Sequence, residues 1–226
     1  MSSAAALLDR LGRPGGLRLG TAHAAGAERL PTGLAPLDAV LGGGLPRGRI
    51  AELVGPPSAG RTGLACAMAA AATRAGETIA WVDPADALDP EGAAGAGVVL
   101  DRTLWIRPHR PGDERRAAEL VLRAGGFGLV VLDLDERASR EPPDTAAVSR
   151  LARAAEGTRT TLLVVAPRPA AGSFAALRLA VEAARVRWSG GPGRLVVLDG
   201  VEAAVRVVRS RVGRPAEARV VRQAGA

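Results

Sequence analysis

The sequence predicts an α/β fold: a mostly parallel, twisted sheet flanked by helices, with an antiparallel edge at its C-terminal end. From Leu30 onward, apolar runs of four to seven residues alternate with stretches of helical length. Such alternation is typical of a parallel sheet that is covered on both faces. After Ala184 short apolar segments are joined by turn residues instead, which indicates antiparallel strands.

The individual elements follow from these patterns. Buried strands are expected where the apolar runs are too continuous for half-exposed ones, at Ile50–Val54, Thr78–Val82, Thr103–Ile106, Leu129–Leu132 and Thr161–Ala166. Helices long enough for crossover connections are expected between them, at Thr62–Arg74, Asp113–Arg123, Asp144–Glu156 and Ser173–Ala184. The C-terminal strands are expected at Arg185–Trp188, Arg194–Leu198, Ala204–Arg209 and Ala218–Val221.

The composition favours one core domain. A chain of 226 residues with 47% hydrophobic residues can bury a single adequate core, and no apolar run approaches the roughly 20 residues needed to cross a bilayer. We expect a flexible or docking N-terminal arm at 1–29, with a short helix at Ala4–Leu11, a core domain at 30–222 and a short tail at 223–226. The N-terminus lacks the pattern of a secretory signal, so we expect a cytoplasmic protein.

The charge distribution is uneven. All 30 basic residues are arginines, and residues 151–226 hold 13 of them against 5 acidic residues. This excess suggests a basic face for DNA or for an acidic protein, although the codon usage of a GC-rich genome would also produce it. Aromatic residues make up only 2% of the chain, so any DNA contact would rest on phosphates rather than on base stacking.

One segment carries a phosphate-binding motif with a single departure. It matches G-x-x-x-x-G-K-[ST] at every fixed position except the lysine, which is Arg61, and it joins a predicted strand to a predicted helix. The backbone and side chains of such a loop cradle nucleotide phosphates, here with the candidate residues Gly55, Pro56, Ser58, Ala59, Gly60, Arg61, Thr62 and Gly63. Arginine is longer and planar, so we expect ATP with Mg²⁺ to bind weakly or not at all. An ordinary glycine-rich turn is the alternative interpretation.

The metal candidates depend on that loop. Asp133 ends the apolar strand Leu129–Leu132, as the Mg²⁺-associated aspartate does in many nucleotide-binding proteins, and Thr62 would be the other ligand if a nucleotide binds. An acidic residue at the end of an apolar strand is also common in α/β folds in general. His23 and His109 are far apart and lack neighbouring ligands, and the single Cys66 is expected in the core.

Several segments resemble RecA. The stretch from Leu30 to Glu52, with Leu41-Gly42-Gly43-Gly44-Leu45-Pro46 at its centre, is similar to the RecA run that leads into the phosphate loop. The segment Trp81–Pro90 is similar to the one that holds the catalytic glutamate of RecA. This resemblance places Ala85 at the glutamate position, so general-base help is lost unless Asp86 moves in. It also places Arg168 where RecA has a glutamine that senses the γ-phosphate.

The resemblance also concerns DNA and the subunit interface. The two DNA-binding loops of RecA are shortened here, one after Asp133 and one around 170–173, which implies impaired binding of single strands. The stretch from Val205 resembles the RecA strand whose basic residues reach the ATP of a neighbouring subunit, which makes Arg206, Arg209 and Arg211 interface or anion-binding candidates. Alternating arginines on an edge strand equally guard against aggregation. The chain ends at Ala226, so the resemblance implies no C-terminal DNA-gathering domain.

Together these departures resemble the ImuA family, which is usually encoded with the Y-family-like protein ImuB and an error-prone polymerase. The resemblance implies a role in damage-induced mutagenesis and translesion synthesis, as a non-catalytic adaptor that contacts RecA, the ImuB-type partner, or both. Three alternatives remain open: an ATPase in which Arg61 is a working variant, a DNA-binding module that uses 151–226, and a cell-division inhibitor of the same fold group. The phosphate loop disfavours the last, because such inhibitors do not need one.

Overall fold

The computed structural model describes residues 28–136, 144–182, 185–191, 195–210 and 217–223. The helix predicted at Ala4–Leu11 lies outside them. The strands are β1 Arg29–Leu30, β2 Leu45–Pro46, β3 Ile50–Val54, β4 Ile79–Val82, β5 Thr103–Ile106, β6 Leu129–Asp133, β7 Thr161–Ala166, β8 Ala175–Val181, β9 Arg185–Ser189, β10 Val197–Ser210 and β11 Glu217–Gln223. The α-helices are α2 Ala35–Leu41, α3 Arg61–Arg74, α4 Pro90–Gly95, α5 Asp113–Ala124 and α6 Thr145–Thr158, with 3₁₀ turns η1 Leu100–Arg102 and η2 Gly172–Phe174.

A nine-stranded sheet forms the centre of the described part of the chain. Its order is β11-β10-β8-β3-β7-β6-β4-β5, and β9 pairs with β10 beside this path. The strands from β8 to β5 are parallel, whereas β10 pairs antiparallel with β8, β9 and β11. The predicted fold class is therefore confirmed, and the five predicted buried strands each match an observed strand to within one residue at either end.

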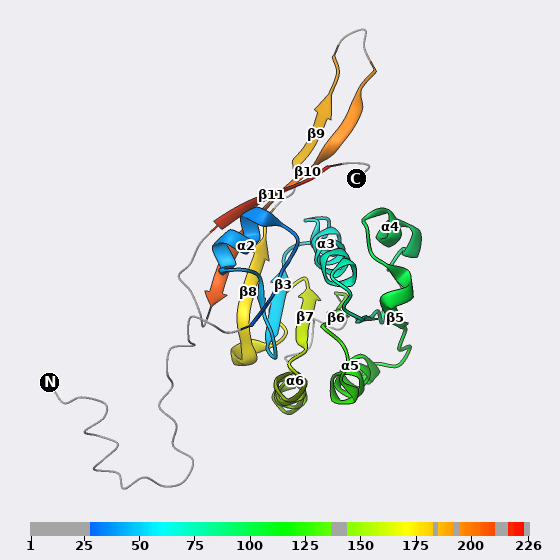
Figure 1. The fold of residues 1–226 in the computed structure, drawn as a ribbon, viewed down its shortest axis with the longest axis vertical. Helices are drawn as coiled ribbons and strands as arrows, with labels where there is room; N and C mark the ends of the chain where they lie inside the picture. The colour runs from blue at the N-terminus through cyan, green and yellow to red at the C-terminus, as the bar shows by residue number, and fades with distance from the viewer. Residues whose placement is uncertain (1–27, 137–143, 183–184, 192–194, 211–216, 224–226) are drawn as a thin grey trace, which may run out of the picture.

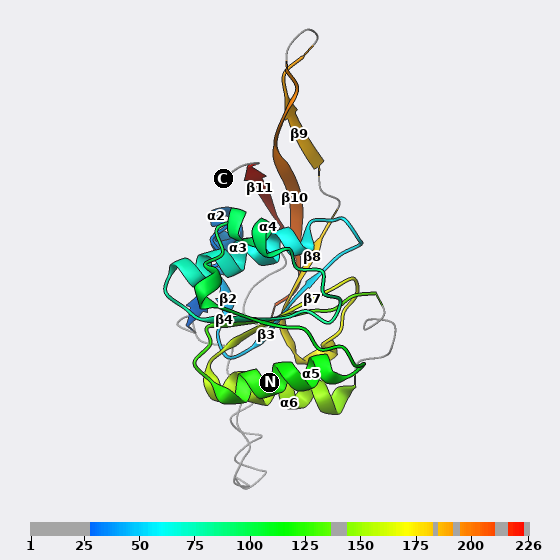
Figure 2. The same ribbon diagram turned by 90° about the vertical axis from the view of Figure 1, so that its right-hand side faces the viewer.

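Helices cover both faces of the sheet, as Figure 2 shows. On one face α2, α3 and α4 pack over a core that includes Leu64, Met68 and Trp81. On the other face Leu122 of α5 and Leu151 of α6 pack against the facing residues of β6 and β7. The alanine-rich α3 is buried on most of its surface, because it lies in the middle of its layer with small side chains that allow close approach.

The ends of the helices match local sequence signals. Asp144 caps α6, since its carboxylate accepts a hydrogen bond from Ala146 N at 2.9 Å. Asp89 caps α4 in the same way through Glu91 N, with Pro90 at the first helical position. None of the described helices has both the length and the apolar character needed to cross a membrane.

The helix predicted at Ser173–Ala184 is wrong, because this segment forms the strand β8. Its Ala-rich sequence has high helix propensity, but every second residue faces one core: Leu177, Leu179 and Val181 all lie with α3. The chain returns from β7 to β8 in the eight residues 167–174, which leaves no room for a crossover helix.

The C-terminal edge also differs from the prediction in one respect. The strand predicted at Ala204–Arg209 and the last two residues of the one predicted at Arg194–Leu198 belong to the single long strand β10, which continues through a register shift between Leu198 and Gly200. Arg194 lies outside the described residues. The first half of β10 pairs with β9, and its second half pairs with β8 and β11. The β9–β10 hairpin therefore projects away from the body of the molecule, as Figure 1 shows.

Candidate nucleotide site

The predicted phosphate loop joins the buried strand β3 to the N-terminus of α3. Gly60 caps the helix in the left-handed region (φ 91°), and Ser58 also has a positive φ of 60°. A methyl group on Gly55 would lie 2.6 Å from the Val181 carbonyl oxygen, so only glycine fits where the loop leaves the sheet. Glycine is thus required where the phosphate-loop motif has it, and the loop backbone has the shape of an anion-binding turn.

Arg61 lies at the first position of α3, in the place of the motif lysine. Its Nη1 is buried and has no hydrogen-bond partner among the described residues. Burial lowers the pKa of the guanidinium, while the negative charges of Asp133 and Glu136 favour its charged form. The guanidinium of Arg61 therefore interacts electrostatically with two carboxylates: that of Asp133, which ends β6, and that of Glu136, which follows β6. Thr62, the next residue, is exposed.

Asp133 ends β6, the second strand from β3, and faces the same edge of the sheet. Burial, together with the charge of Asp83, raises its pKa to about 6 against the opposing effect of the Arg61 charge. The indole N–H of Trp81 also favours the carboxylate, although Trp81 Nε1 does not reach hydrogen-bond geometry with any described atom. At neutral pH this carboxylate is mostly ionised and held close to an arginine.

The segment predicted to have lost a catalytic glutamate follows β4. Ala85 is exposed there, and the neighbouring Asp86 has a positive φ of 52° and pairs with Arg107 at 3.4 Å. Arg107 in turn stacks on the Trp105 ring at 4.5 Å. Asp86 is thus engaged in a surface ion pair, and its carboxylate does not replace a base at Ala85 in this structure.

Asp83, at the end of β4, has a structural role. It is buried and accepts hydrogen bonds from Ala87 N, Leu88 N and Trp105 Nε1 at 3.1, 2.9 and 3.2 Å. These three donors fix the turn that carries Ala85 and Asp86. Through these hydrogen bonds Asp83 stabilises the turn. It affects the pKa of Asp133 through its charge.

Arg168 follows β7, the strand between β3 and β6. It is exposed, and its Nη2 lies 3.8 Å from Glu136 Oε2. Glu136 also faces Arg61 electrostatically. The structure therefore brings Arg61, Asp133 and Arg168 to the carboxyl edge of three adjacent parallel strands.

Glu52 organises the connection that carries Arg168, and sequence reasoning missed this role. It lies in the middle of β3 with none of its surface exposed. Its Oε1 accepts hydrogen bonds from Ala170 N and Ala171 N, at 2.7 and 2.5 Å, and its Oε2 accepts one from Arg178 Nε at 2.6 Å. A lone acidic residue inside the apolar run Ile50–Val54 was the available signal.

The predicted interface residues lie on β10, away from the phosphate loop. Arg206 Nε donates to Glu182 Oε1 at 3.0 Å on the surface. Arg209 donates to the carbonyl oxygens of Gly172 and Ser173 at 3.3 and 3.2 Å, so within one chain it holds the η2 turn. Arg211 lies outside the described residues. The use of these residues at a subunit interface stays a prediction.

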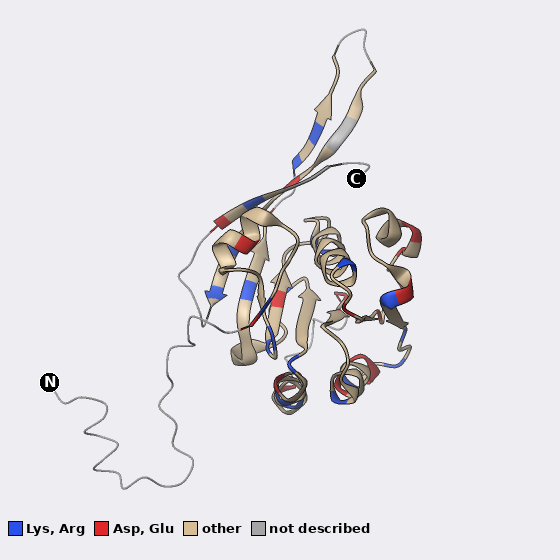
Figure 3. Ribbon diagram, in the orientation of Figure 1, with Lys and Arg blue, Asp and Glu red and all other residues tan. Residues whose placement is uncertain are grey.

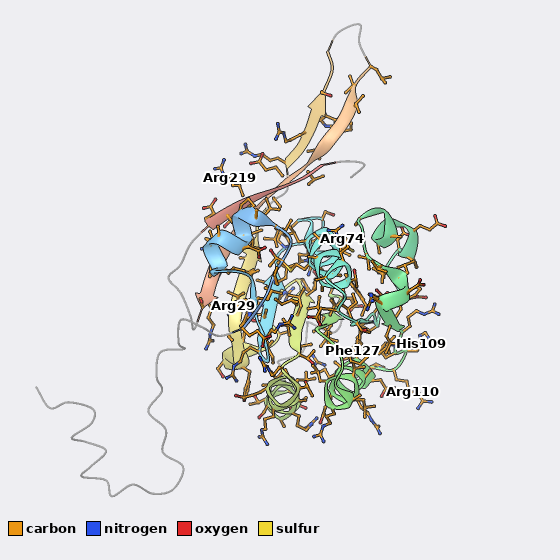
Figure 4. All side chains as sticks on the ribbon, in the orientation of Figure 1. Arg29, Arg74, His109, Arg110, Phe127 and Arg219 are labelled. Atoms are coloured by element: carbon orange, nitrogen blue, oxygen red, sulfur yellow. The ribbon has the colours of Figure 1, made fainter. Side chains whose placement is uncertain are left out.

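The remaining candidate residues from the sequence are the single cysteine and the two histidines. Cys66 lies on α3 and is buried in the core, as predicted. His109 is exposed, and Figure 4 labels it beside Arg110 near the surface, while His23 lies outside the described residues. Among the described residues, no group of three or more His, Cys, Asp or Glu side chains is arranged to hold a metal ion.

Comparison with known proteins agrees with this geometry. The model of the RecA N-terminal domain matches residues 2–168. Protein RecA of Clavibacter michiganensis subsp. michiganensis is 42% identical over 135 residues, which are 59% of this chain and 37% of that protein. Protein RecA of Saccharopolyspora erythraea is 42% identical over 118 residues, which are 52% of this chain and 34% of that protein. The matches thus span little more than a third of these relatives.

A solved structure supports the fold over a longer part of the chain. The crystal structure of the RadB recombinase superimposes with a TM-score of 0.64 at 20% identity, covering 84% of this chain and 94% of that one. This similarity concerns the fold alone. The family model matches most of the chain, so the chain belongs to the RecA N-terminal domain family.

Proposed function

We propose that this chain is a non-catalytic RecA-like adaptor of the ImuA type, which acts in damage-induced mutagenesis and translesion synthesis through contact with RecA, the ImuB-type partner, or both. The observation that carries the proposal is the state of the nucleotide site. Arg61, Ala85 and Arg168 replace the lysine, the glutamate and the glutamine expected from RecA, and they surround one site. Loss of the base and the sensor together removes two separate requirements of hydrolysis.

The same site supports residual binding of a nucleotide. The loop keeps its glycines and its left-handed turn, and Arg61 Nη1 is an unsatisfied donor that a phosphate oxygen would satisfy. If ATP binds, the loop amides before α3 would hold its phosphates, and Thr62 with Asp133 would hold Mg²⁺, which supplies charge neutralisation at the phosphates. This chain would then retain a scaffold for nucleotide binding without the groups that activate water.

The excess of arginines gives limited support to the alternative of DNA binding. Arg159, Arg168, Arg178 and Arg206 each pair with a carboxylate, and Arg209 binds carbonyl oxygens. Within the described residues, four of the 13 arginines in 151–226 are thus paired with a carboxylate. A weak ATPase or recombination mediator remains the second candidate, because the loop backbone is intact and Arg61 carries a charge that phosphate attracts.

Hydrolysis and nucleotide binding separate the two candidates. We expect ATP turnover of the wild-type protein to equal that of Arg61→Ala, and Arg61→Lys to tighten nucleotide binding without starting turnover. Turnover should appear only when Arg61→Lys is combined with Ala85→Glu and Arg168→Gln, because the base and the sensor are then both present. Measurable turnover in the wild type that Arg61→Ala abolishes would contradict the adaptor proposal and favour the ATPase.

Binding assays test the adaptor role directly. The wild-type chain is titrated against RecA filaments and against the ImuB-type protein from the same genome, with sedimentation or calorimetry as the readout. We expect saturable binding to at least one of them without a requirement for ATP hydrolysis. Absence of binding to both would overturn the proposal.

A further inference from the structure

The β9–β10 hairpin is the feature of the described fold that the nucleotide site does not use. It extends beyond the sheet and the helices in both views (Figures 1 and 2). Gly190, which follows β9, has a φ of 105°, and a Cβ there would collide with the Leu195 carbonyl. Glycine is therefore required where the chain leaves β9.

The hairpin exposes an unusual amount of apolar surface. Trp188 is 60% exposed and Leu195 is 84% exposed, and Val186, Val196 and Val197 are exposed beside them. The root of the hairpin is charged instead of apolar. A surface cavity of 330 Å³ there is lined by charged side chains, including Glu182, Arg185, Glu202, Glu217 and Arg219. Figure 4 labels Arg219 on β11. Apolar exposure is thus concentrated toward the tip, and such a patch marks an interaction surface.

The two faces of β9 differ in chemistry. Val186 and Trp188 alternate with Arg185 and Arg187, so the apolar side chains lie on one face and the arginines on the other. Val201 is the register partner of Val186, and Gly200 is the partner of Arg187. Figure 3 shows basic residues and no acidic residue along β9. Glu202 is the register partner of Arg185, so the hairpin presents an apolar face and a face on which two arginines outnumber one acidic residue.

This chemistry fits a protein partner better than DNA or a second copy. Apart from Trp188 and the two arginines, the large exposed side chains are aliphatic and neither bind phosphate nor stack on bases, whereas Trp and Arg together with buried aliphatics are typical of protein interface centres. Two copies meeting through one face of a five-residue strand would bury less than the roughly 800 Å² per partner of a stable interface. Insertion into a groove buries both faces.

We propose that the β9–β10 hairpin inserts into a groove of a protein partner whose apolar wall packs on Val186 and Trp188 and whose acidic wall faces Arg185 and Arg187. The inference rests on the proposed adaptor function, because it names the surface through which that function operates. The arginines steer the encounter with the acidic wall, and burial of the apolar face provides the affinity.

The test uses the full chain with RecA and with the ImuB-type protein as probes. One variant carries Val186→Thr and Trp188→Ser, a second carries Arg185→Glu and Arg187→Glu, and the control carries Leu120→Ser on α5, where a leucine is similarly exposed (61%) outside the hairpin. We expect each hairpin variant to bind the partner at least about tenfold more weakly and the control to bind as the wild type. Equal thermal midpoints of all variants would show that the fold is retained.

A second readout follows from the tryptophans. Trp188 is exposed while Trp81 is buried, so partner binding should shift Trp188 emission to the blue and protect it from acrylamide. Wild-type binding that both hairpin variants retain would overturn this inference and leave the adaptor function standing. Binding of the wild type to neither probe would overturn both. If the hairpin variants instead lose DNA affinity or self-association while partner binding is unchanged, the surface serves nucleic acid or a second copy, and the inference is wrong.

Discussion

Glu52 and Arg178 are register partners on the parallel strands β3 and β8, and Arg178 Nε donates to Glu52 Oε2 at 2.6 Å inside the sheet. The same carboxylate accepts the amides of Ala170 and Ala171. A crossover between parallel strands normally contains a helix that satisfies its own amides. Here a buried carboxylate satisfies two amides of the short connection, and an arginine balances its charge.

Replacing Arg178 with methionine should therefore destabilise the protein strongly. The change leaves the Glu52 charge buried without its counterion, which typically costs about 3–5 kcal/mol. Urea unfolding followed by circular dichroism measures the free energy of unfolding. The matched control is Arg206→Met, whose ion pair with Glu182 is exposed and should contribute less than about 1 kcal/mol.

The double variant Glu52→Leu with Arg178→Met separates charge from backbone support. A simple buried ion pair can often be replaced by apolar residues at little cost. We expect the double variant to stay destabilised, because the Ala170 and Ala171 amides lose their acceptor. Recovery of wild-type stability in the double variant would show that Glu52 does not support the crossover.

The pH dependence of stability should report on Asp133. Its pKa is raised to about 6 in the folded protein, so the folded state holds this proton more tightly than the unfolded chain does. Its stabilising contribution is present below the unfolded pKa near 4 and is lost as the pH rises through about 6. Asp133→Asn removes that dependence, and after allowance for solvent screening it should gain about 1–2 kcal/mol relative to wild type between pH 4 and pH 7.5. A stability difference that stays constant over this range would contradict the raised pKa.

Glycine at position 55 should be required for the fold of the loop. Gly55→Ala places a methyl group 2.6 Å from the Val181 carbonyl oxygen, so the loop or β8 must shift at a cost of about 1–3 kcal/mol. Thermal or urea unfolding gives the measurement. Gly95→Ala is the control: it lies in α4 with open space around its Cβ position, and it should be neutral or slightly stabilising. Equal behaviour of the two variants would mean that Gly55 is not sterically constrained.

Sequence patterns could predict the parallel half of the fold because continuous apolar runs and crossover helices are local signals. They failed at β8, where Ala and Leu favour a helix but the open edge of β3 pairs with the segment. Arg61, Asp133 and Arg168 lie at one edge of the sheet because parallel strands end at a common edge, and their use as a nucleotide site stays a prediction. Sequence patterns could not show that Asp86 pairs with Arg107 or that Glu52 binds the crossover, because both depend on residues distant in the sequence.

Arg209 has one role within the chain and another that the resemblance to RecA predicts, and one substitution separates them. Arg209→Lys keeps the charge for a neighbouring subunit but loses the planar fork that binds the Gly172 and Ser173 carbonyls together. If the arginine holds η2, the Phe174 amide, which donates to Ala171 O, should exchange its hydrogen faster, by about tenfold, in both Arg209→Lys and Arg209→Ala. Hydrogen exchange read by mass spectrometry provides the measurement, and Arg206→Ala is the control.

If the charge of Arg209 serves an interface, only Arg209→Ala should weaken binding to RecA or to the ImuB-type partner. If the Phe174 amide exchanges at the wild-type rate in both variants, Arg209 does not stabilise η2, because a loop fixed by Glu52 alone would not respond to a substitution of Arg209.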